Sequence, residues 1–286
     1  MSIRVRTALL TIVALAAFTS NSLLTRLTLG QRQVDAALFT SIRLASGALV
    51  LVLVVRAQAG TFTPLRGDRI GEPLALFAYA LPFSFAYLCI GAAVGALVLF
   101  GAVQLTMIGY AVLRGERPAA PTWVGVGLAT AGLLLLTLPS VTRPDPLGLV
   151  LMVVAGAAWG AYSLAGRTAR DPIAVNAHAF LVSGVLAIAV NLLLRTPLAA
   201  SGRGVALALL SGGVTTGLGY AAWYRALPGL SVTQAAVAQL TVPIIAALGA
   251  TVLLDERLSA RLVASGAAIL GGLGLVLLER SRSRAS

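Results

Sequence analysis

The chain has 286 residues, of which 58% are hydrophobic and only 10% are charged, and its mean hydropathy is +0.95. A soluble domain carries about 25% charged residues, so this composition excludes a water-exposed globule and predicts an all-α polytopic membrane protein. The formal net charge of +12 does not indicate a nucleic-acid partner, because all 21 basic residues are Arg and they are scattered at the ends of apolar runs. The single cysteine, Cys89, excludes an intramolecular disulfide and a multi-cysteine metal site. We expect neither a metal nor a cofactor.

The first apolar run has some features of a secretory leader. Arg4 and Arg6 precede it, and Ala14-Leu15-Ala16 has the small-x-small pattern of a cleavage site. However, the apolar stretch before Ala14 is short, and the run continues to Leu24. We therefore interpret it as the first membrane span.

Apolar runs along the chain predict ten spans. In chain order they are Thr7–Leu24, Ala36–Val55, Pro73–Ile90, Ala92–Leu113, Pro121–Leu138, Pro146–Ala165, Ile173–Leu194, Gly204–Tyr224, Ser231–Leu254 and Ser259–Leu278. Residues 73–113 hold no charge; as one helix they would be ~61 Å long, about two bilayer crossings, so this run contains two spans. Residues 279–286 are rich in Arg and Ser and predict a disordered cytoplasmic tail.

The distribution of Arg among the loops predicts the topology. With the N-terminus inside, thirteen Arg lie in inside segments and seven in outside segments, which favours two cytoplasmic termini. Trp123 and the Tyr220-Trp223-Tyr224 group then fall at the cytoplasmic interface, where we interpret them as aromatic-belt residues. Arg without Lys, together with heavy use of Ala, Leu, Val and Gly, hints at a GC-rich bacterial genome.

The second half of the chain echoes the first. Ala226–Leu258 and Gly91–Pro118 each contain a long charge-free span that ends in an acidic-basic cluster. Further matches, at offsets of 137 to 140 residues, are Ser46-Gly47-Ala48-Leu49 with Ser183-Gly184-Val185-Leu186, Glu116 with Glu256, and Gly132 with Gly272. Five spans in each half is an odd number, so the halves enter the membrane in opposite orientations. We expect two inverted five-helix repeats, 1–142 and 143–278, around a central cavity.

The two halves close their fourth spans with Gly115-Glu116-Arg117-Pro118 and Asp255-Glu256-Arg257-Leu258. In this pattern the chain resembles the drug/metabolite transporter superfamily, in its ten-span EamA branch, and its size and short loops resemble the bacterial aromatic amino-acid exporters. The resemblance implies a basket of ten helices with spans one, three, four, six, eight and nine around the cavity. It also implies a multi-pass protein of the bacterial inner membrane, a monomer or weak homodimer, with an aromatic amino acid as its small-molecule partner.

The acidic residues all lie at span ends or in loops. They are Asp35, Asp68, Glu72, Glu116, Asp145, Asp171, Asp255, Glu256 and Glu279. Proton-coupled pumps usually keep an Asp or Glu within the membrane, so we hypothesise facilitated transport. The same lack, with one His and one Cys, argues against an enzyme. Inverted symmetry places Glu116 and Glu256 on opposite membrane faces, and we interpret each as a cap of the helix that follows it.

Two ionisable side chains lie inside spans. Arg43 lies about eight residues into span two, ~12 Å along the helix, where a charge is costly. Either it anchors a substrate carboxylate or forms part of a gate, or it snorkels to the outer interface or binds carbonyls of a broken helix. His178, near the start of span seven, is either a satisfied polar residue or a proton carrier.

Aromatic residues in spans three and six are candidates for a binding surface. Trp159 lies far from either end of span six, and Tyr162 and Ser163 follow on the same helical face. Tyr79 and Phe83 share one face of span three. They either pack against lipid or core, or they form a cavity wall that stacks on a flat substrate and offers hydroxyl groups.

Neutral amides and prolines interrupt the apolar spans. The amides are Asn21, Gln104, Gln234 and Gln239. They either bond across helices or face the substrate. Pro82 and Pro243 each remove a backbone donor and free a carbonyl, which is tolerated beside a cavity, so both are hinge candidates. In spans five and ten, small residues four apart, such as Gly125 with Ala129 and Ala268 with Gly272, indicate close helix packing or a dimer contact.

Together these features predict an exporter of aromatic amino acids that works by alternating access. The alternatives are an exporter of other amino acids or of cationic drugs such as methyl viologen, with or without proton coupling. A channel would need a continuous row of polar residues, which these spans do not contain.

Overall fold

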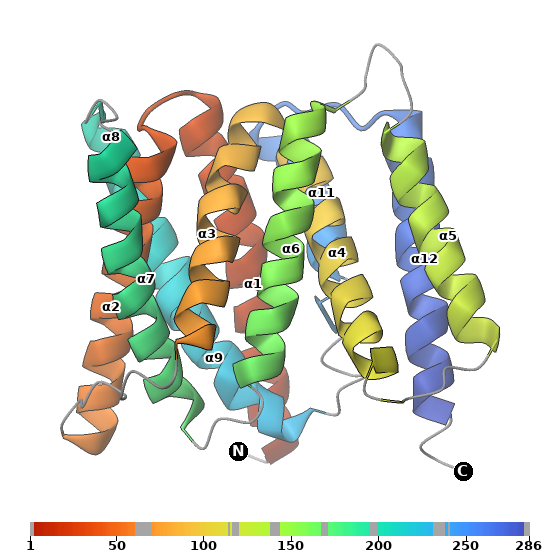
Figure 1. Cartoon of the computed structure of the whole chain (residues 1–286), viewed down its shortest axis with the longest axis horizontal. Coiled ribbons are helices and arrows are strands. Elements are labelled where there is room, and N and C mark those ends of the chain that lie inside the picture. The colour runs from red at the N-terminus through yellow and green to blue at the C-terminus, as the bar shows by residue number, and fades with distance from the viewer. Residues whose placement is uncertain are drawn as a thin grey trace.

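The computed structural model describes residues 3–60, 70–113, 115, 120–137, 144–166, 171–194, 199–230, 238–239 and 241–282. Within these residues the regular elements are helices, apart from one isolated β-bridge between Val34 and Ala200. The main helices are α1 (Ile3–Gly30), α2 (Ala36–Ala59), α3 (Gly71–Cys89), α4 (Ala92–Leu113), α5 (Ala120–Thr137), α6 (Pro146–Gly166), α7 (Pro172–Leu194), α8 (Gly202–Leu210), α11 (Thr241–Leu253) and α12 (Ala260–Arg282). They stand side by side, and α1 begins at the end of the molecule where α12 ends (Figure 1).

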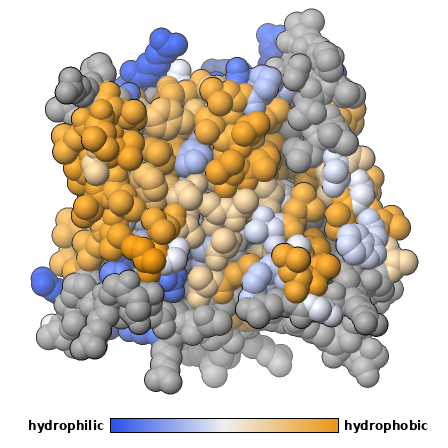
Figure 2. Space-filling view, in the orientation of Figure 1, coloured by the Kyte–Doolittle hydropathy of each residue, from blue (hydrophilic) through white to orange (hydrophobic). Residues whose placement is uncertain are grey.

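The helices have the length and the surface of membrane spans. Within the described ranges, seven helical stretches are long and apolar enough to cross a membrane, and three apolar helices are shorter. Large apolar side chains such as Leu113, Leu193 and Val252 are highly exposed. Figure 2 shows hydrophobic residues over most of the visible face, with hydrophilic residues gathered towards its upper and lower edges. This surface is suited to lipid, and the sequence-based assignment to the helical membrane proteins is confirmed.

Span eight is continuous but not uniform. The helix runs from Gly202 to Ala226 through α8, a π-helical segment η1 (Ser211–Leu218) and α9 (Gly219–Ala226). A 3-10 turn, η2 (Leu227–Gly229), follows it. The Thr216 hydroxyl bonds to the Ser211 carbonyl five residues earlier, at 2.7 Å. The apolar pattern of this span did not predict the π-helical segment, and π-helical turns are frequent at functional sites.

Glycines allow η1 to lie directly against α2. A Cβ atom on Gly212 would collide with the Arg43 carbonyl and the Ser46 hydroxyl, and would lie 2.7 Å from the Arg43 Cα. A Cβ on Gly217 would lie 3.4 Å from the Cα of Gly47. The backbone of η1 therefore contacts the backbone of α2 at Arg43, whose side chain is buried.

α5 and α12 form a pair at one edge of the molecule (Figure 1). A Cβ on Gly132 would lie 2.9 Å from Ala268, and a Cβ on Gly272 would lie 2.8 Å from the backbone nitrogen of Ala129. The prediction of close packing between the small-residue faces of spans five and ten is confirmed. The other helices pack more centrally, with α3 against α6, α2 against α7, and α1 against η1 and α9.

Candidate functional site

Aromatic rings from four helices meet around Trp159 on α6. Its ring centroid lies 5.1 Å from that of Tyr79 on α3, 4.8 Å from Tyr220 on α9, 6.2 Å from Phe18 on α1, and 5.6 Å from Tyr162 on its own helix. All of these side chains are buried. The structure thus places Trp159, Tyr79 and Tyr162, three of the predicted site residues, in one cluster, and the lipid-facing alternative for them is wrong.

Phe83 extends this cluster along α3. Its ring centroid lies 5.1 Å from that of Tyr79 and 4.9 Å from that of Tyr87. Ser163, predicted on the same face as Trp159, is half-buried. Successive turns of α3 therefore present Tyr79, Phe83 and Tyr87 as a continuous aromatic stripe inside the protein.

The interpretation of Tyr220, Trp223 and Tyr224 as belt residues is wrong. All three are buried, and Phe18 makes edge-to-face contacts with Tyr220 at 5.8 Å and with Trp223 at 5.7 Å between ring centroids. Their position near a span end suggested the interface, but the contact of α9 with α1 turns them inward. Trp123 on α5 is 55% exposed, which agrees with a belt position.

A small cavity lies within the aromatic cluster. Its volume is about 20 Å³. The lining residues are Phe18, Asn21, Ser22, Tyr79, Phe83, Leu99, Phe100, Trp159 and Tyr220. This is room for about one water, so any organic ligand must displace the rings that surround it.

Asn21 supplies a polar group to the cavity wall. Its Oδ1 atom accepts hydrogen bonds from the Ser211 hydroxyl at 2.8 Å and from the Thr216 hydroxyl at 3.4 Å, both on η1. The hydroxyl of Tyr79 faces the side chains of Asn21, Tyr220 and Arg43. The predicted role of Asn21 in bonding across helices is confirmed, and the same residue lines the cavity.

Arg43 lies in the interior with few partners. Its side chain is 1% exposed. One terminal nitrogen, Nη2, donates to the Ala80 carbonyl at 3.0 Å, whereas Nε and Nη1 have no hydrogen-bond partner among the residues that the structure describes. Its guanidinium carbon lies 5.0 Å from the centre of the Phe83 ring and 5.8 Å from those of Phe39 and Tyr79. These cation–π contacts contribute about 0.5–2 kcal/mol each and offset only part of the cost of burying a charge.

These contacts decide between the alternatives for Arg43. Snorkelling to the outer interface is wrong, because the guanidinium lies against α3 inside the protein. Arg43 does bind a backbone carbonyl, that of Ala80 in α3. However, α3 is a continuous helix through the half-buried Pro82, and the carbonyl that this proline frees is that of Ala78, so the broken-helix part of the prediction is wrong. The bond to Ala80 uses one nitrogen and leaves the other two without hydrogen-bond partners among the described residues. Roles of Arg43 and Pro82 in ligand binding or gating stay predictions.

Tyr162 connects the cluster to α7 and α9. Its hydroxyl donates a short hydrogen bond to Oδ1 of Asn176, and it also interacts with the hydroxyl of Tyr224. Glu72, in the first turn of α3, acts electrostatically on both tyrosines. This polar group therefore lies where α3, α6, α7 and α9 approach one another.

The remaining predicted residues lie in several places. Gln104 on α4 is buried, and its Nε2 atom has no hydrogen-bond partner in the described part of the chain; Gln239 is buried as well. His178 is buried on α7. Pro243 is the third residue of α11 and is buried. Gln234 lies outside the described residues, and the ligand or hinge roles of the others stay predictions.

Glu256 joins the two halves of the chain at one end of the molecule. Its Oε1 atom accepts from Nε of Arg26 at 3.2 Å and from the backbone N–H of Ala92 at 3.0 Å, and Oε2 accepts from Ala93 at 3.5 Å. The prediction that Glu256 caps the following helix is wrong, because it caps α4, and α12 is capped by Ser259. Glu116 lies outside the described residues.

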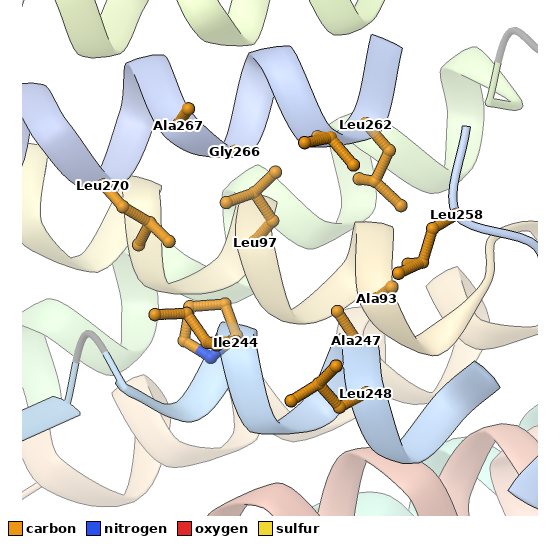
Figure 3. Close-up of a pocket in the computed structure, with 12 residues that line it drawn as sticks. Ala93, Leu97, Ile244, Ala247, Leu248, Leu258, Leu262, Gly266, Ala267 and Leu270 are labelled. Carbon is orange, nitrogen blue, oxygen red and sulfur yellow. The ribbon is translucent and has the colours of Figure 1, made fainter. Parts of the chain in front are cut away.

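A second pocket lies between α4, α11 and α12 (Figure 3). It has a volume of about 230 Å³, and its lining includes Leu97, Pro243, Ile244, Leu248 and Leu262. The side chains that line it are all apolar. Since it lacks a polar group to orient a ligand, we place the candidate site at the aromatic cluster instead. In the described part of the chain, no group of three or more His, Cys, Asp or Glu could hold a metal.

The fold and site together define a multi-pass helical membrane protein with an aromatic centre that contains a buried cation. Comparison with known proteins identifies the family. Residues 146–278 match the EamA-like transporter family. The chain is 46% identical over 275 residues to the uncharacterized protein PA1977 of Pseudomonas aeruginosa, with 96% of each chain covered. It is 28% identical over 175 residues to the uncharacterized transporter YwfM of Bacillus subtilis, with 59% of each covered.

A solved crystal structure of a protein with 21% sequence identity has the same fold, with a TM-score of 0.70 over 96% of this chain and 98% of that one. The chain belongs to the EamA-like transporter family of the drug/metabolite transporter superfamily. It is therefore a membrane transporter and not an enzyme.

Proposed function

We propose that this transporter exports small aromatic metabolites, aromatic amino acids foremost, from the cytoplasm across the bacterial inner membrane. The observation that carries the proposal is the convergence of Trp159, Tyr79, Phe18 and Tyr220 around one cavity with Asn21 in its wall. Flat aromatic ligands stack on such rings, and neighbouring hydroxyl and amide groups orient the polar part of the ligand.

The mechanism that we propose is alternating access between two inverted five-helix repeats, 1–142 and 143–278. The three shorter apolar helices, added to the seven long ones, agree with ten spans. The contacts between helices are also consistent with an exchange of the halves. α2 packs on α7 and α5 packs on α12, so each of these two contacts joins equivalent helices of the two halves. The contact of α3 with α6 corresponds to that of α9 and η1 with α1. The contact of α4 with α6 corresponds to that of α11 with α1. Rocking of one repeat against the other would open the aromatic cluster to each side in turn.

We place both termini in the cytoplasm, on the basis of the Arg distribution. In this orientation the Arg26–Glu256 pair lies at the outer end, where it holds α1, α4 and the loop before α12 together. The small cavity and this closed outer end are consistent with an occluded state.

For coupling we propose facilitated transport. The acidic residues that the structure describes lie at helix ends or in the loops between helices, and none of them lines the cavity. A pH gradient alone should therefore fail to drive accumulation of substrate. Uphill uptake driven only by a pH gradient in liposomes of the pure protein would contradict this part of the proposal.

Cationic drugs are the weaker alternative. Arg43 contacts two of the rings that line the cavity, and its positive charge would repel methyl viologen there. Other amino acids remain the second candidate, because Asn21 and the tyrosine hydroxyls could orient any amino-acid backbone.

The test is uptake of phenylalanine, tryptophan, threonine and methyl viologen into proteoliposomes of the purified protein, with and without a pH gradient. We expect phenylalanine and tryptophan to enter fastest. Trp159→Ala should lower their uptake at least tenfold, because it removes the ring on which the other aromatic residues converge. The matched control is Trp123→Ala, which removes an exposed tryptophan of α5. Unchanged uptake by Trp159→Ala would refute the assignment of the site.

A further inference from the structure

We propose that the Arg43 guanidinium is the anchor for a substrate carboxylate, and that the site therefore accepts small aromatic carboxylates whether or not they carry an α-amino group. This inference rests on the proposed function, since it takes the aromatic cluster as the binding site. It adds a residue from α2, a helix outside the set that the family resemblance places around the cavity, and it names the chemical class of the ligand.

The Arg43 guanidinium has hydrogen-bond donors that no group in the described part of the chain accepts. A guanidinium has five N–H donors and no acceptor, so its unfilled positions are complementary only to acceptors or anions. In Arg43, both Nε and Nη1 are buried without a hydrogen-bond partner among the described residues, whereas Nη2 donates to the Ala80 carbonyl and the Tyr79 hydroxyl also faces the guanidinium. No carboxylate in the described part of the chain forms an ion pair with it. A ligand carboxylate would supply both the charge and the acceptors.

The guanidinium lies directly behind the wall of the aromatic cavity. Tyr79 and Phe83 line the cavity, and both rings also contact the guanidinium. Arg43 does not itself line the cavity, so these two rings form the wall between them. An aromatic ligand is too large for the present volume and must displace this wall. The same movement of the two rings would bring the carboxylate of the ligand against the Arg43 guanidinium.

The lining of the cavity has no matching site for an ammonium group. The cavity lining contains no acidic side chain. The Oδ1 atom of Asn21 already accepts two hydroxyl hydrogen bonds. Glu72 lies in the first turn of α3, ~10 Å of helix rise before Tyr79, and Glu256 is engaged by Arg26. The surroundings of the cavity thus favour a negative group and offer no counter-charge to an amine.

The experiment compares four ligands that share a phenyl ring and differ in charge at pH 7. They are 3-phenylpropionate, phenylalanine, neutral 3-phenylpropan-1-ol and cationic phenethylamine. Binding to the full-length protein in nanodiscs is measured by isothermal titration calorimetry. We expect 3-phenylpropionate to bind at least as tightly as phenylalanine, the alcohol at least tenfold more weakly, and phenethylamine not measurably.

Arg43→Gln should remove the tenfold preference for the carboxylate over the alcohol while the affinity for the alcohol stays the same. Arg43→Lys, which keeps the charge with fewer donors, should restore part of the preference. Arg203→Gln removes an exposed arginine at the start of α8 and is the matched control. A merely structural role for Arg43 would weaken all ligands alike and leave their ratio unchanged. The wild-type ligand series is decisive even if a variant does not fold.

The outcomes separate this inference from the proposed function. Binding of phenethylamine as tight as that of 3-phenylpropionate, or an unchanged preference in Arg43→Gln, would overturn the anchor while an aromatic transporter remains. Arg43-dependent binding of 3-phenylpropionate without binding of phenylalanine would support the anchor and refute amino acids as the substrate. Binding of none of the four would overturn both.

Discussion

Arg26 and Arg43 lie on consecutive helices of the first half, α1 and α2, yet their surroundings are opposite in kind. Arg26 is 27% exposed, and it has a carboxylate partner in Glu256 and a carbonyl partner in Tyr87 at 2.9 Å. Arg43 is almost fully buried, and among the described residues it has one carbonyl partner, the facing hydroxyl of Tyr79 and three aromatic neighbours, but no carboxylate. The more deeply buried cation, for which the loss of water costs more, has the poorer set of partners.

This difference indicates what each arginine is for. A paired charge that also caps a helix end holds the structure together, as Glu256 does by joining Arg26 to the N-terminus of α4. A buried charge without a counter-ion reduces stability in the free protein, and such groups are retained at functional sites. The comparison assigns Arg26 to the scaffold and Arg43 to the ligand, and three substitutions test it.

The largest effect is expected where the scaffold fixes the position of Arg43. Gly212→Ala would place a methyl group against the Arg43 carbonyl and the Ser46 hydroxyl, and backbone atoms of a packed helix pair cannot move away cheaply. We expect destabilisation by about 3 kcal/mol or more. The measurement is the thermal unfolding midpoint in detergent. Gly213→Ala is the matched control, because its Cβ would meet only Val50, at 3.4 Å; equal midpoints for the two variants would contradict the contact.

The contact at Gly212 also shows the limit of sequence reasoning. Apolar runs predict where helices begin and end, since lipid fixes their length, and all ten predicted runs contain helix in the described residues. Helical spacing also grouped Tyr79 with Phe83 and Trp159 with Tyr162. In contrast, the π-helical turn at Ser211–Leu218 has no hydrophobic period of its own. The Gly-rich run from Gly212 to Gly219 was the available signal.

Contacts between helices account for the other differences. Tyr220 and Trp223 lie near a span end, where an interfacial position and a buried one look alike in sequence; only the packing of α9 on α1 decides. Glu256 follows α11 and precedes α12, but the hydrogen-bond partners of its carboxylate are 163 residues or more away in the chain. Whether Arg43 snorkels likewise depends on which residues of α3 lie beside it. Local pattern does not contain this information.

The second largest effect is expected for the loss of Glu256, the carboxylate partner of Arg26. Glu256→Ala leaves the Arg26 guanidinium without its carboxylate and the N–H groups of Ala92 and Ala93 without acceptors. Because the pair is partly exposed, we expect a loss of about 2 kcal/mol in the free energy of unfolding. Glu256→Gln keeps an acceptor and should lose about half as much. Arg257→Ala, an exposed change in the same loop, is the control; if it costs as much as Glu256→Ala, the pair has no special role.

The smallest effect on stability, and the one that separates the two arginines most clearly, is expected for Arg43→Met. Methionine retains much of the apolar contact with Phe39, Tyr79 and Phe83 and removes an uncompensated charge from the interior. We expect the ligand-free protein to be unchanged or more stable by about 1 kcal/mol, while uptake of phenylalanine into proteoliposomes falls at least tenfold. Unfolding in detergent and uptake are measured on the same preparation. A stability loss as large as that of Glu256→Ala would place Arg43 in the scaffold with Arg26, because the Ala80 carbonyl and the three rings would then be its main partners.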